Sequence, residues 1–236
     1  MTELLSIQRL SLNFAGREIL NQLELKLMPG EVVSVLGSNG AGKSTLLKSI
    51  LGLHGSAQQT GNILISGIDI ELSRHEAISQ LAYVPEQPAV YGHLSAIENI
   101  RYFLSLSAVD QAIDTAKCLA TAGLPELAWH RPCSEYSKGM KQKVMLAFAL
   151  AKQAKLLLLD EPNSGLDPQA TEELNQLILR CKEQGMGVLV VTHDVLSALE
   201  FSDRLLMLND GKLQPVTLDK SNLSIESLKR LYQGQV

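Results

Sequence analysis

A nine-residue stretch from Gly37 to Thr45 carries the clearest chemistry in the chain, because it matches the pattern G-x-x-x-x-G-K-[ST]. Glycines allow backbone N–H groups to close around phosphate oxygens, and a helix N-terminus adds a favourable dipole. We expect Lys43 to reach the β- and γ-phosphates and the Ser44 hydroxyl to complete a Mg²⁺ shell. The candidate phosphate-binding residues are Gly37, Ser38, Asn39, Gly40, Ala41, Gly42, Lys43, Ser44 and Thr45.

The alternative for this stretch is a glycine-rich turn before a helix. Its surroundings favour phosphate binding, because the apolar run Val32–Leu36 predicts a strand before the loop and Leu46 to Leu51 predicts an apolar helix after it. The sequence therefore predicts that the chain binds a nucleoside triphosphate. The Asn-Lys-x-Asp tetrapeptide by which small GTPases read guanine is absent from the sequence.

Two consecutive carboxylates, Asp160 and Glu161, follow four leucines and are predicted to lie beside the phosphate loop. The leucines predict a buried strand whose C-terminal end delivers both side chains to that site. Asp160 suits a Mg²⁺ shell, and Glu161 is then placed to orient or deprotonate an attacking water. Without the phosphate loop, Asp-Glu-Pro after a strand would be interpreted as a turn.

Strands and helices that alternate along the chain must position these residues. Alternation of Leu23, Leu25 and Leu27 with charged residues predicts a half-buried strand. Strands are also predicted at Asn62 to Ile65, 156–159, 188–191, 204–208 and 212–214, and helices at 138–153 and 168–183. This order is typical of an α/β core with a mainly parallel sheet.

The segment from Ser95 to Ala122 differs from the rest of the chain, because it has few strand signals and is predicted to form a helical insert. Its apolar residues recur at helical spacing. They are Ile97, Ile100, Leu104, Ile113, Ala116 and Ala120.

Composition excludes several classes of protein. The 21 Lys and Arg against 25 Asp and Glu give a formal charge of −4, so no global attraction to nucleic acid is expected. The longest apolar run, Val144 to Ala151, has eight residues, whereas a membrane-spanning helix needs about 20. The N-terminal sequence lacks the basic start and apolar stretch of a signal peptide. The three cysteines, Cys118, Cys133 and Cys181, are expected to be reduced and buried.

Four further segments follow the phosphate loop along the chain and complete a set of sequence motifs. They are Tyr136 to Lys143 (Tyr-Ser-Lys-Gly-Met-Lys-Gln-Lys), Asp160-Glu161-Pro162, Ser164 to Asp167 (Ser-Gly-Leu-Asp) and Val191 to Asp194 (Val-Thr-His-Asp). With the phosphate loop, they make the chain resemble the nucleotide-binding subunit of ABC transporters, and specifically the export type with a separate permease chain. The resemblance implies one ATPase domain over residues 1–236. Its fold would be that of a P-loop NTPase, with a RecA-like, mainly parallel core, an N-terminal antiparallel β subdomain and an α-helical subdomain inserted at about 88–140.

The same resemblance assigns roles to individual residues. Phe14 would stack on adenine, and Gln87 would touch Mg²⁺ or water and link the core to the helical insert. His193 would contact the γ-phosphate and hold Glu161 in place. The remaining ATP contacts would come from a second subunit, through Ser137, Gly139 and Asp167.

The segment Tyr136 to Lys143 corresponds to the signature segment of the family. It departs from the common Leu-Ser-Gly-Gly-Gln pattern, because Tyr136, Lys138 and Met140 replace the Leu, the first Gly and the Gln. Ser137 and Gly139 remain, and Lys138 adds a positive charge near a phosphate.

The implied function is an ATPase with ATP and Mg²⁺ as cofactors, powering transport through a separate permease from the cytoplasmic face of the membrane. The implied partners are that permease, docked near Gln87 and Tyr91 to Ile100, and a second copy of the chain or a homologous ATPase subunit. No nucleic-acid partner is expected. An ABC-type ATPase of a soluble assembly complex, with no transport, remains the alternative. At the C-terminus, Ile225, Leu228 and Leu231 predict an amphipathic helix.

Overall fold

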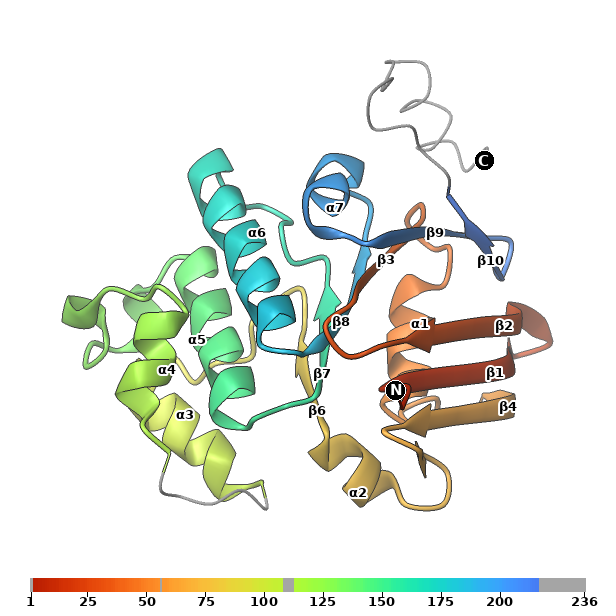
Figure 1. Cartoon of the computed structure of the whole chain (residues 1–236), viewed down its shortest axis with the longest axis horizontal. Coiled ribbons are helices and arrows are strands. Elements are labelled where there is room, and N and C mark those ends of the chain that lie inside the picture. The colour runs from red at the N-terminus through yellow and green to blue at the C-terminus, as the bar shows by residue number, and fades with distance from the viewer. Residues whose placement is uncertain (1, 56, 108–112, 217–236) are drawn as a thin grey trace.

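Two β-sheets separated by a helix organise the chain, which the computed structural model describes over residues 2–55, 57–107 and 113–216 (Figure 1). The strands are β1 (Leu5–Phe14), β2 (Arg17–Leu27), β3 (Val32–Leu36), β4 (Gln58–Ile65), β5 (Ile68–Asp69), β6 (Leu81–Val84), β7 (Leu156–Asp160), β8 (Gly187–Thr192), β9 (Arg204–Asn209) and β10 (Lys212–Pro215). The helices are α1 (Lys43–Ile50), α2 (Arg74–Ser79), α3 (Ala96–Ser105), α4 (Thr115–Thr121), α5 (Lys138–Ala151), α6 (Pro168–Glu183) and α7 (Val195–Phe201), with short 3₁₀ turns at Glu126–Ala128 and Cys133–Glu135. The helix predicted around Ile225 lies outside the described residues.

The first sheet is antiparallel, with the strand order β2-β1-β4-β5. The alternation predicted in β2 is confirmed, because Leu23, Leu25 and Leu27 are all buried. Their apolar face packs with Leu46 and Ile50 of α1, which lies between the two sheets (Figure 1). This sheet therefore supports α1 from the side opposite the parallel strands.

The second sheet has the order β10-β9-β3-β8-β7-β6, and all its pairs are parallel except the hairpin of β9 and β10. Its central strands are buried on both faces, as the near-continuous apolar runs predicted. In β7, for example, Leu156 and Leu158 join the core beneath α1, whereas Leu157 and Leu159 join the core beneath the helices. The predicted turn closes the hairpin, with positive φ angles at Asp210 and Gly211.

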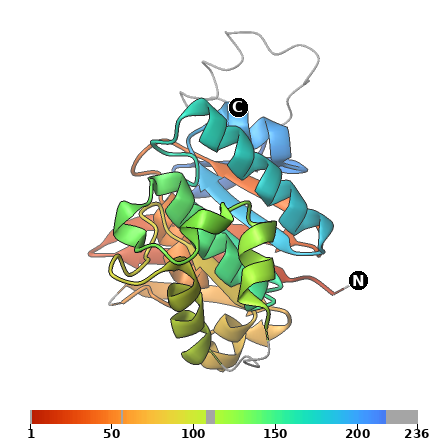
Figure 2. The same cartoon turned by 90° about the vertical axis from the view of Figure 1, so that its left-hand side faces the viewer.

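Helices α5 and α6 cover the other face of the parallel sheet, and α3 and α4 pack on the outer side of α5 (Figure 1); Figure 2 views the molecule from this helical side. The alanines of α4 do not mark its buried face. Ala120 is exposed and Ala116 is half-buried, whereas Leu119 is fully buried and Thr115 is buried beside it. Leu119 lies on the buried face because burying it removes far more apolar surface from water than burying alanine does.

Several predicted boundaries shift while the elements remain. Helix α1 begins at Lys43 rather than Leu46, because the end of the phosphate loop forms its first turn. Strand β4 begins at Gln58, four residues before the predicted start. The predicted α/β fold class is confirmed, with a mainly parallel sheet, an N-terminal antiparallel sheet and helices between β6 and β7.

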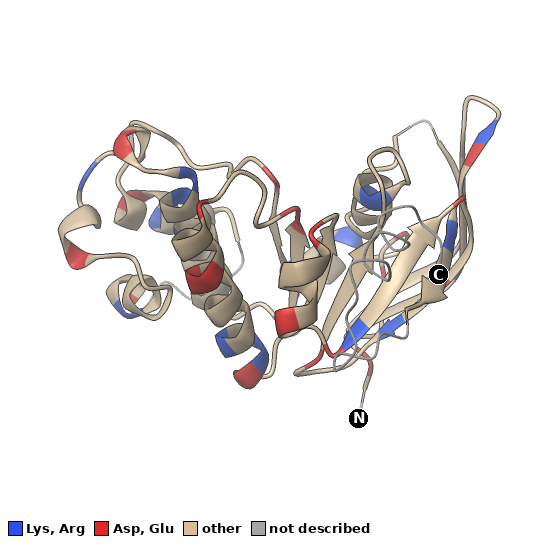
Figure 3. Cartoon of the chain, turned by 90° about the horizontal axis from the view of Figure 1, so that it is seen from above, with Lys and Arg blue, Asp and Glu red and all other residues tan. Residues whose placement is uncertain are grey.

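All three cysteines are free, but they are not equally buried. Cys133 and Cys181 are buried, and burial raises the pKa of the Cys181 thiol to about 12, as expected for an unreactive core thiol. Cys118 is only half-buried, which corrects the prediction that all three lie in the core. Figure 3 shows acidic and basic residues interspersed over both the helical and the strand-rich sides of the molecule.

Candidate functional site

The phosphate loop connects the C-terminal end of β3 to the first turn of α1, as its pattern predicted. Gly42 has a φ of 105°, a backbone conformation that favours glycine, and it caps α1 without a side chain. A side chain at Gly37 would lie only 2.9 Å from the carbonyl oxygen of Leu208, so the loop needs glycine there too. A cavity of about 300 Å³ opens beside the loop. It is lined by Arg17, Ile19, Ser38, Asn39, Gly40, Gly42, Lys43, Ser44, Thr45, Glu86 and Glu161.

The Lys43 ammonium lies in this cavity, where it donates to two backbone carbonyls and pairs with one carboxylate. Its Nζ donates to the carbonyl oxygens of Gly37 at 2.6 Å and Ser38 at 3.2 Å, and it lies 3.2 Å from Oε1 of Glu161. Only 6% of the lysine is exposed. The side chain therefore curls back over its own loop, and a bound phosphate must exchange with one of these acceptors.

Glu161 is fixed by three donors from the neighbouring strand end. Its Oε2 accepts hydrogen bonds from Thr192 Oγ1 at 3.0 Å and the His193 backbone N–H at 3.0 Å, and it lies 2.8 Å from His193 Nδ1. Because β7 and β8 are parallel neighbours, the residues that follow them meet at one edge of the sheet. Glu161 also has a φ of 46°, a conformation that costs a residue other than glycine about 1–3 kcal/mol. The carboxylate is therefore held in one orientation toward Lys43.

Asp160 lies beside Glu161 in a less favourable electrostatic setting. Burial raises its pKa above the ordinary value, with further raising by the charges of Glu161 and Glu86, while hydrogen bonds from Tyr83 and Ser44 act in the opposite direction. Tyr83 donates to Asp160 Oδ2 at 3.3 Å, and burial together with the nearby carboxylate raises the pKa of Tyr83 to about 12. An added cation would relieve this charge crowding.

The residues around Asp160 fit a magnesium ion of the kind that nucleotides carry. No group of three or more His, Cys, Asp and Glu side chains suited to a metal occurs within residues 2–55, 57–107 and 113–216. Mg²⁺ in nucleotide sites needs only one or two carboxylates, with water and phosphate oxygens as the other ligands. Asp160 and the Ser44 hydroxyl supply that limited oxygen set.

The signature segment lies elsewhere, at the N-terminus of α5. Ser137 caps the helix by accepting a hydrogen bond from the Met140 N–H at 3.2 Å, and Gly139 packs against the start of α6. Lys138, which was expected to add charge near a phosphate, donates to the carbonyl oxygen of Ser164 at 2.6 Å. Asp167 caps α6 by accepting a hydrogen bond from the Ala170 N–H at 2.9 Å. Among the described residues, those that line the phosphate cavity include none from this segment.

Phe14 and Gln87 are exposed predicted site residues that do not line the phosphate cavity. Phe14 is 54% exposed at the end of β1, and Gln87 is exposed in the loop after β6. Neither lines the phosphate cavity, although their neighbours Arg17 and Glu86 do. The structure thus brings the loop, Asp160, Glu161 and His193 together, and it places these two side chains at the margin.

Several residues of the site were not predicted from the sequence, among them Thr192, Tyr83 and Arg17, as well as Ile19 and Glu86. Thr192 bonds Glu161 across 31 positions, Tyr83 bonds Asp160 across 77, and Arg17 reaches the cavity from the antiparallel sheet. Thr192 lies within the segment Val191 to Asp194, which was recognised without a role for this residue. Spacing carries no signal for Tyr83 or Arg17.

The fold and the site together define a nucleoside triphosphatase with a phosphate loop and a neighbouring acidic pair. A family model described as "ABC transporter" matches residues 20–164, more than half of the 236 residues. A second model, "AAA domain, putative AbiEii toxin, Type IV TA system", matches the shorter stretch 130–200. The chain belongs to the ABC transporter ATP-binding family, as predicted, and it is an ATPase.

Three relatives match almost the whole chain. The lantibiotic transport ATP-binding protein SrtF of Streptococcus pyogenes is 32% identical over 233 residues, which cover 99% of this chain and 97% of SrtF. The lipopolysaccharide export system ATP-binding protein LptB of Acidithiobacillus ferridurans is 32% identical over 239 residues, covering 99% and 98%. The glutamine transport ATP-binding protein GlnQ of Escherichia coli is 33% identical over 221 residues, covering 89% of each chain.

Solved structures agree with this assignment. The structure of an ATP-binding subunit of an ABC transporter superposes with a TM-score of 0.83 at 30% identity, covering 98% of this chain and 99% of its own. The cassette MJ0796, solved as a post-hydrolysis dimer bound to ADP and Pi, superposes with a TM-score of 0.78 at 27% identity, covering 91% and 99%. The predicted fold family, a P-loop NTPase, is confirmed.

Proposed function

We propose that two copies of this chain clamp two ATP molecules between them and that hydrolysis drives export through a separate membrane permease. The observation that carries this proposal is the separation of two phosphate-binding features within one chain. Glu161 and Lys43 complete one side of a phosphate site, whereas Ser137 and Gly139 present a helix N-terminus away from that cavity. A second copy, placed head to tail, would bring its helix start to the first copy's γ-phosphate.

In the proposed hydrolysis step, Glu161 is the proton acceptor. Three contacts hold its Oε2, so Oε1 is the oxygen that faces Lys43 and the phosphate loop. The oxygen of a water bonds to the γ-phosphorus, its proton passes to Oε1, and the bond to the bridging oxygen of the leaving ADP breaks. When bound, Mg²⁺ would neutralise charge on the β- and γ-phosphates, held by Ser44, Asp160 and Gln87.

The exposure of His193 and Asp167 supports their proposed roles. The ring of His193 is 54% exposed while its Nδ1 lies beside Glu161, so its other face is open to a γ-phosphate. Asp167 is exposed at the start of α6, where a second copy could meet it. Phe14, also exposed, offers a ring face for adenine.

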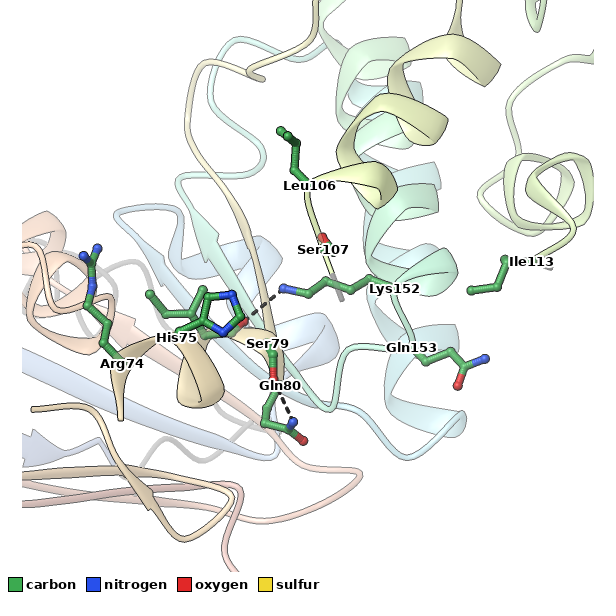
Figure 4. Close-up of a pocket in the computed structure, with 10 residues that line it drawn as sticks. Arg74, His75, Ser79, Gln80, Leu106, Ser107, Ile113, Lys152 and Gln153 are labelled. Atoms are coloured by element: carbon green, nitrogen blue, oxygen red, sulfur yellow. Dashed lines mark hydrogen bonds between the residues drawn. The ribbon is translucent and has the colours of Figure 1, made fainter. Parts of the chain in front are cut away.

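We place the permease on the helical side, around Gln87, Tyr91 to Ile100 and helix α3. Tyr91 and Tyr102 are each more than 40% exposed and meet edge to face, with ring centroids 5.1 Å apart. The C-terminal end of α3 borders a hollow of about 800 Å³ (Figure 4). Its walls come from α2 on the core side and from the residues that directly follow α3 and α5 on the helical side. A partner segment bound there would therefore move with any rotation between the two sides.

Lys152, just after α5, connects the two walls of this hollow. Figure 4 shows its side chain crossing toward α2, where Nζ donates to the carbonyl oxygens of Ile78 at 3.0 Å and Leu81 at 2.6 Å. Burial lowers the pKa of this lysine. These two hydrogen bonds connect the core side of the hollow to its helical side.

The membrane location is part of the same proposal. Within residues 2–55, 57–107 and 113–216, none of the helices has the length and apolar character that a membrane crossing requires. We propose that the chain works at the cytoplasmic face by binding the permease. The relative named for lipopolysaccharide export supports the outward direction.

Co-purification from detergent-solubilised membranes tests the partner. The tagged chain should recover a polytopic membrane protein, and Leu106→Glu, at a 68% exposed residue beside the hollow, should lose it. Leu127→Glu, at a residue that is 91% exposed in the turn after α4, is the matched control and should keep it. Recovery of only soluble partners would contradict transport and favour the assembly-complex alternative.

A further inference from the structure

Arg17 is a cation at the nucleotide cavity whose role neither the resemblance nor the phosphate-loop pattern assigns. It is the first residue of β2, and it lines the cavity together with Ile19. Alternate residues of a strand share a face, which places Arg17 and Ile19 on the same side of β2. Ile19 lies within 3.5 Å of the position that a side chain on Gly42 would take. That face of β2 therefore points at the phosphate loop.

The neighbour of Arg17 across the hairpin is Phe14, the residue predicted to stack on adenine. The two are directly paired, and the turn between them consists of Ala15 and Gly16, both with positive φ. Directly opposed residues of an antiparallel pair place their side chains on the same face. A nucleotide whose base meets Phe14 and whose phosphates enter the loop must therefore pass Arg17.

The charges in the cavity single out Arg17 as the cation that is free to meet a phosphate. Lys43 is paired with Glu161, and it also donates to two loop carbonyls. Among the described residues, by contrast, no carboxylate forms a salt bridge with Arg17. A guanidinium presents a planar pair of N–H donors that matches two phosphate oxygens.

We propose that Arg17 binds the phosphate chain of ATP and ADP and thereby sets the preference of the site for phosphorylated adenosine. This inference rests on the nucleotide site described above and deepens it. The guanidinium reaches the phosphates from the side opposite α1, so the phosphate chain of the nucleotide lies between β2 and the phosphate loop. The contact is made before any second copy arrives.

Calorimetric titration of the full chain with ADP, and with adenosine as the phosphate-free probe, tests the proposal. Arg17→Gln should weaken ADP binding about fivefold to tenfold at low salt and leave adenosine affinity unchanged. Arg17→Lys should recover part of the loss, since a charge remains without the planar pair of donors. The difference between wild type and Arg17→Gln should shrink as salt screens the exposed charge.

Lys26→Gln is the matched control, because it removes one positive charge from the other end of β2, where Lys26 pairs with Glu3 at the surface. It should bind ADP within about twofold of wild type. Unchanged ADP affinity in Arg17→Gln would overturn the inference, and an equal loss for ADP and adenosine would overturn it in favour of a base contact. A wild-type chain that fails to bind ADP would instead overturn the nucleotide site itself and the inference with it.

Discussion

Two regions of this chain are built differently: the phosphate-loop edge, which comprises the loop with Lys43 and Glu161, and the signature edge, which comprises the starts of α5 and α6. At the first, Lys43 and Glu161 are both less than 9% exposed, and Glu161 is held by Lys43, Thr192 and His193. At the second, Ser137 and Asp167 are exposed, and their side chains make the caps of α5 and α6. One edge is assembled within the chain, whereas the other presents helix starts to solvent.

This difference teaches which contacts a single copy can make for itself. A buried, fully bonded carboxylate and lysine are organised before ATP arrives, so binding to that edge requires no partner. In the proposed dimer, the start of α5 is the anion-binding feature that the second copy contributes, because the first N–H groups of a helix favour a phosphate. Variants at the two edges should therefore fail in different assays.

The largest effect is expected from Lys43→Met. It removes a buried ammonium from the cavity, so nucleotide affinity should fall about 100-fold or more, as expected for a lost charge-assisted contact. Lys48→Met, an exposed position on the same helix, should bind ADP like wild type. Calorimetric titration with ADP measures both, and normal ADP binding by Lys43→Met would contradict the assignment of this edge.

At the other edge, Gly139→Glu should reduce ATP hydrolysis about 100-fold while ADP affinity stays normal. The carboxylate would repel a γ-phosphate brought by a second copy, but Gly139 does not line the chain's own cavity. Gly139→Ala is the matched control, because its Cβ would meet Ala170 at an ordinary 3.4 Å. If Gly139→Glu lost ADP affinity as well, the two edges would not be separable.

A smaller loss is expected for His193→Ala. Glu161 keeps its bonds to Thr192 and to the backbone N–H of residue 193, so the carboxylate loses one of three contacts at Oε2. Steady-state kinetics should show kcat reduced about tenfold to 100-fold with little change in KM for ATP. His130→Ala, at an exposed residue of the helical side, is the control. A change confined to KM would place His193 in binding rather than in positioning Glu161.

The smallest effect is a change in stability, and Asp160→Asn should make the folded chain slightly more stable. The raised pKa of Asp160 means that its charged form is disfavoured in the folded chain, a cost present at neutral pH that fades as the pH falls toward 3.8. Thermal unfolding should show a Tm about 2–4 °C higher at pH 7, with the gain shrinking on acidification. Asp210→Asn, at an exposed turn, should show no such trend. A lower Tm at pH 7 would refute the charge crowding.

Local sequence patterns predicted many of the strands and helices, whereas features that depend on long-range contacts could not be predicted. The runs Val32–Leu36 and Leu156–Leu159 identify buried strands because both faces are apolar, and the loop pattern identifies its own strand and helix. Strand β6 went unpredicted, because Leu81 to Val84 is too short for its pattern to stand out. The spacing of Ala116 and Ala120 indicates a helix but does not reveal the buried face of α4, because small residues carry little of the burial energy.

The residues of the site also fall into two groups, those that local patterns predicted and those that depend on long-range contacts. Spacing predicted Lys43, Asp160 and Glu161, since each is fixed by the strand immediately before it. Arg17 and Tyr83 could not be predicted, because they reach the site through the pairing of strands far apart in the sequence. The bond from Lys138 to Ser164 was missed because it depends on how α5 packs against the loop before α6.

The most direct test of the central claim is the mass of Glu161→Gln in solution. This change keeps the size and most contacts of the side chain but removes the proton acceptor, so ATP should stay bound. Light scattering should give 25.7 kDa without nucleotide and about twice that mass with ATP and Mg²⁺. Adding Gly139→Glu to the same chain should return it to the single-copy mass. A Glu161→Gln chain that binds ATP yet remains a single copy would contradict the account.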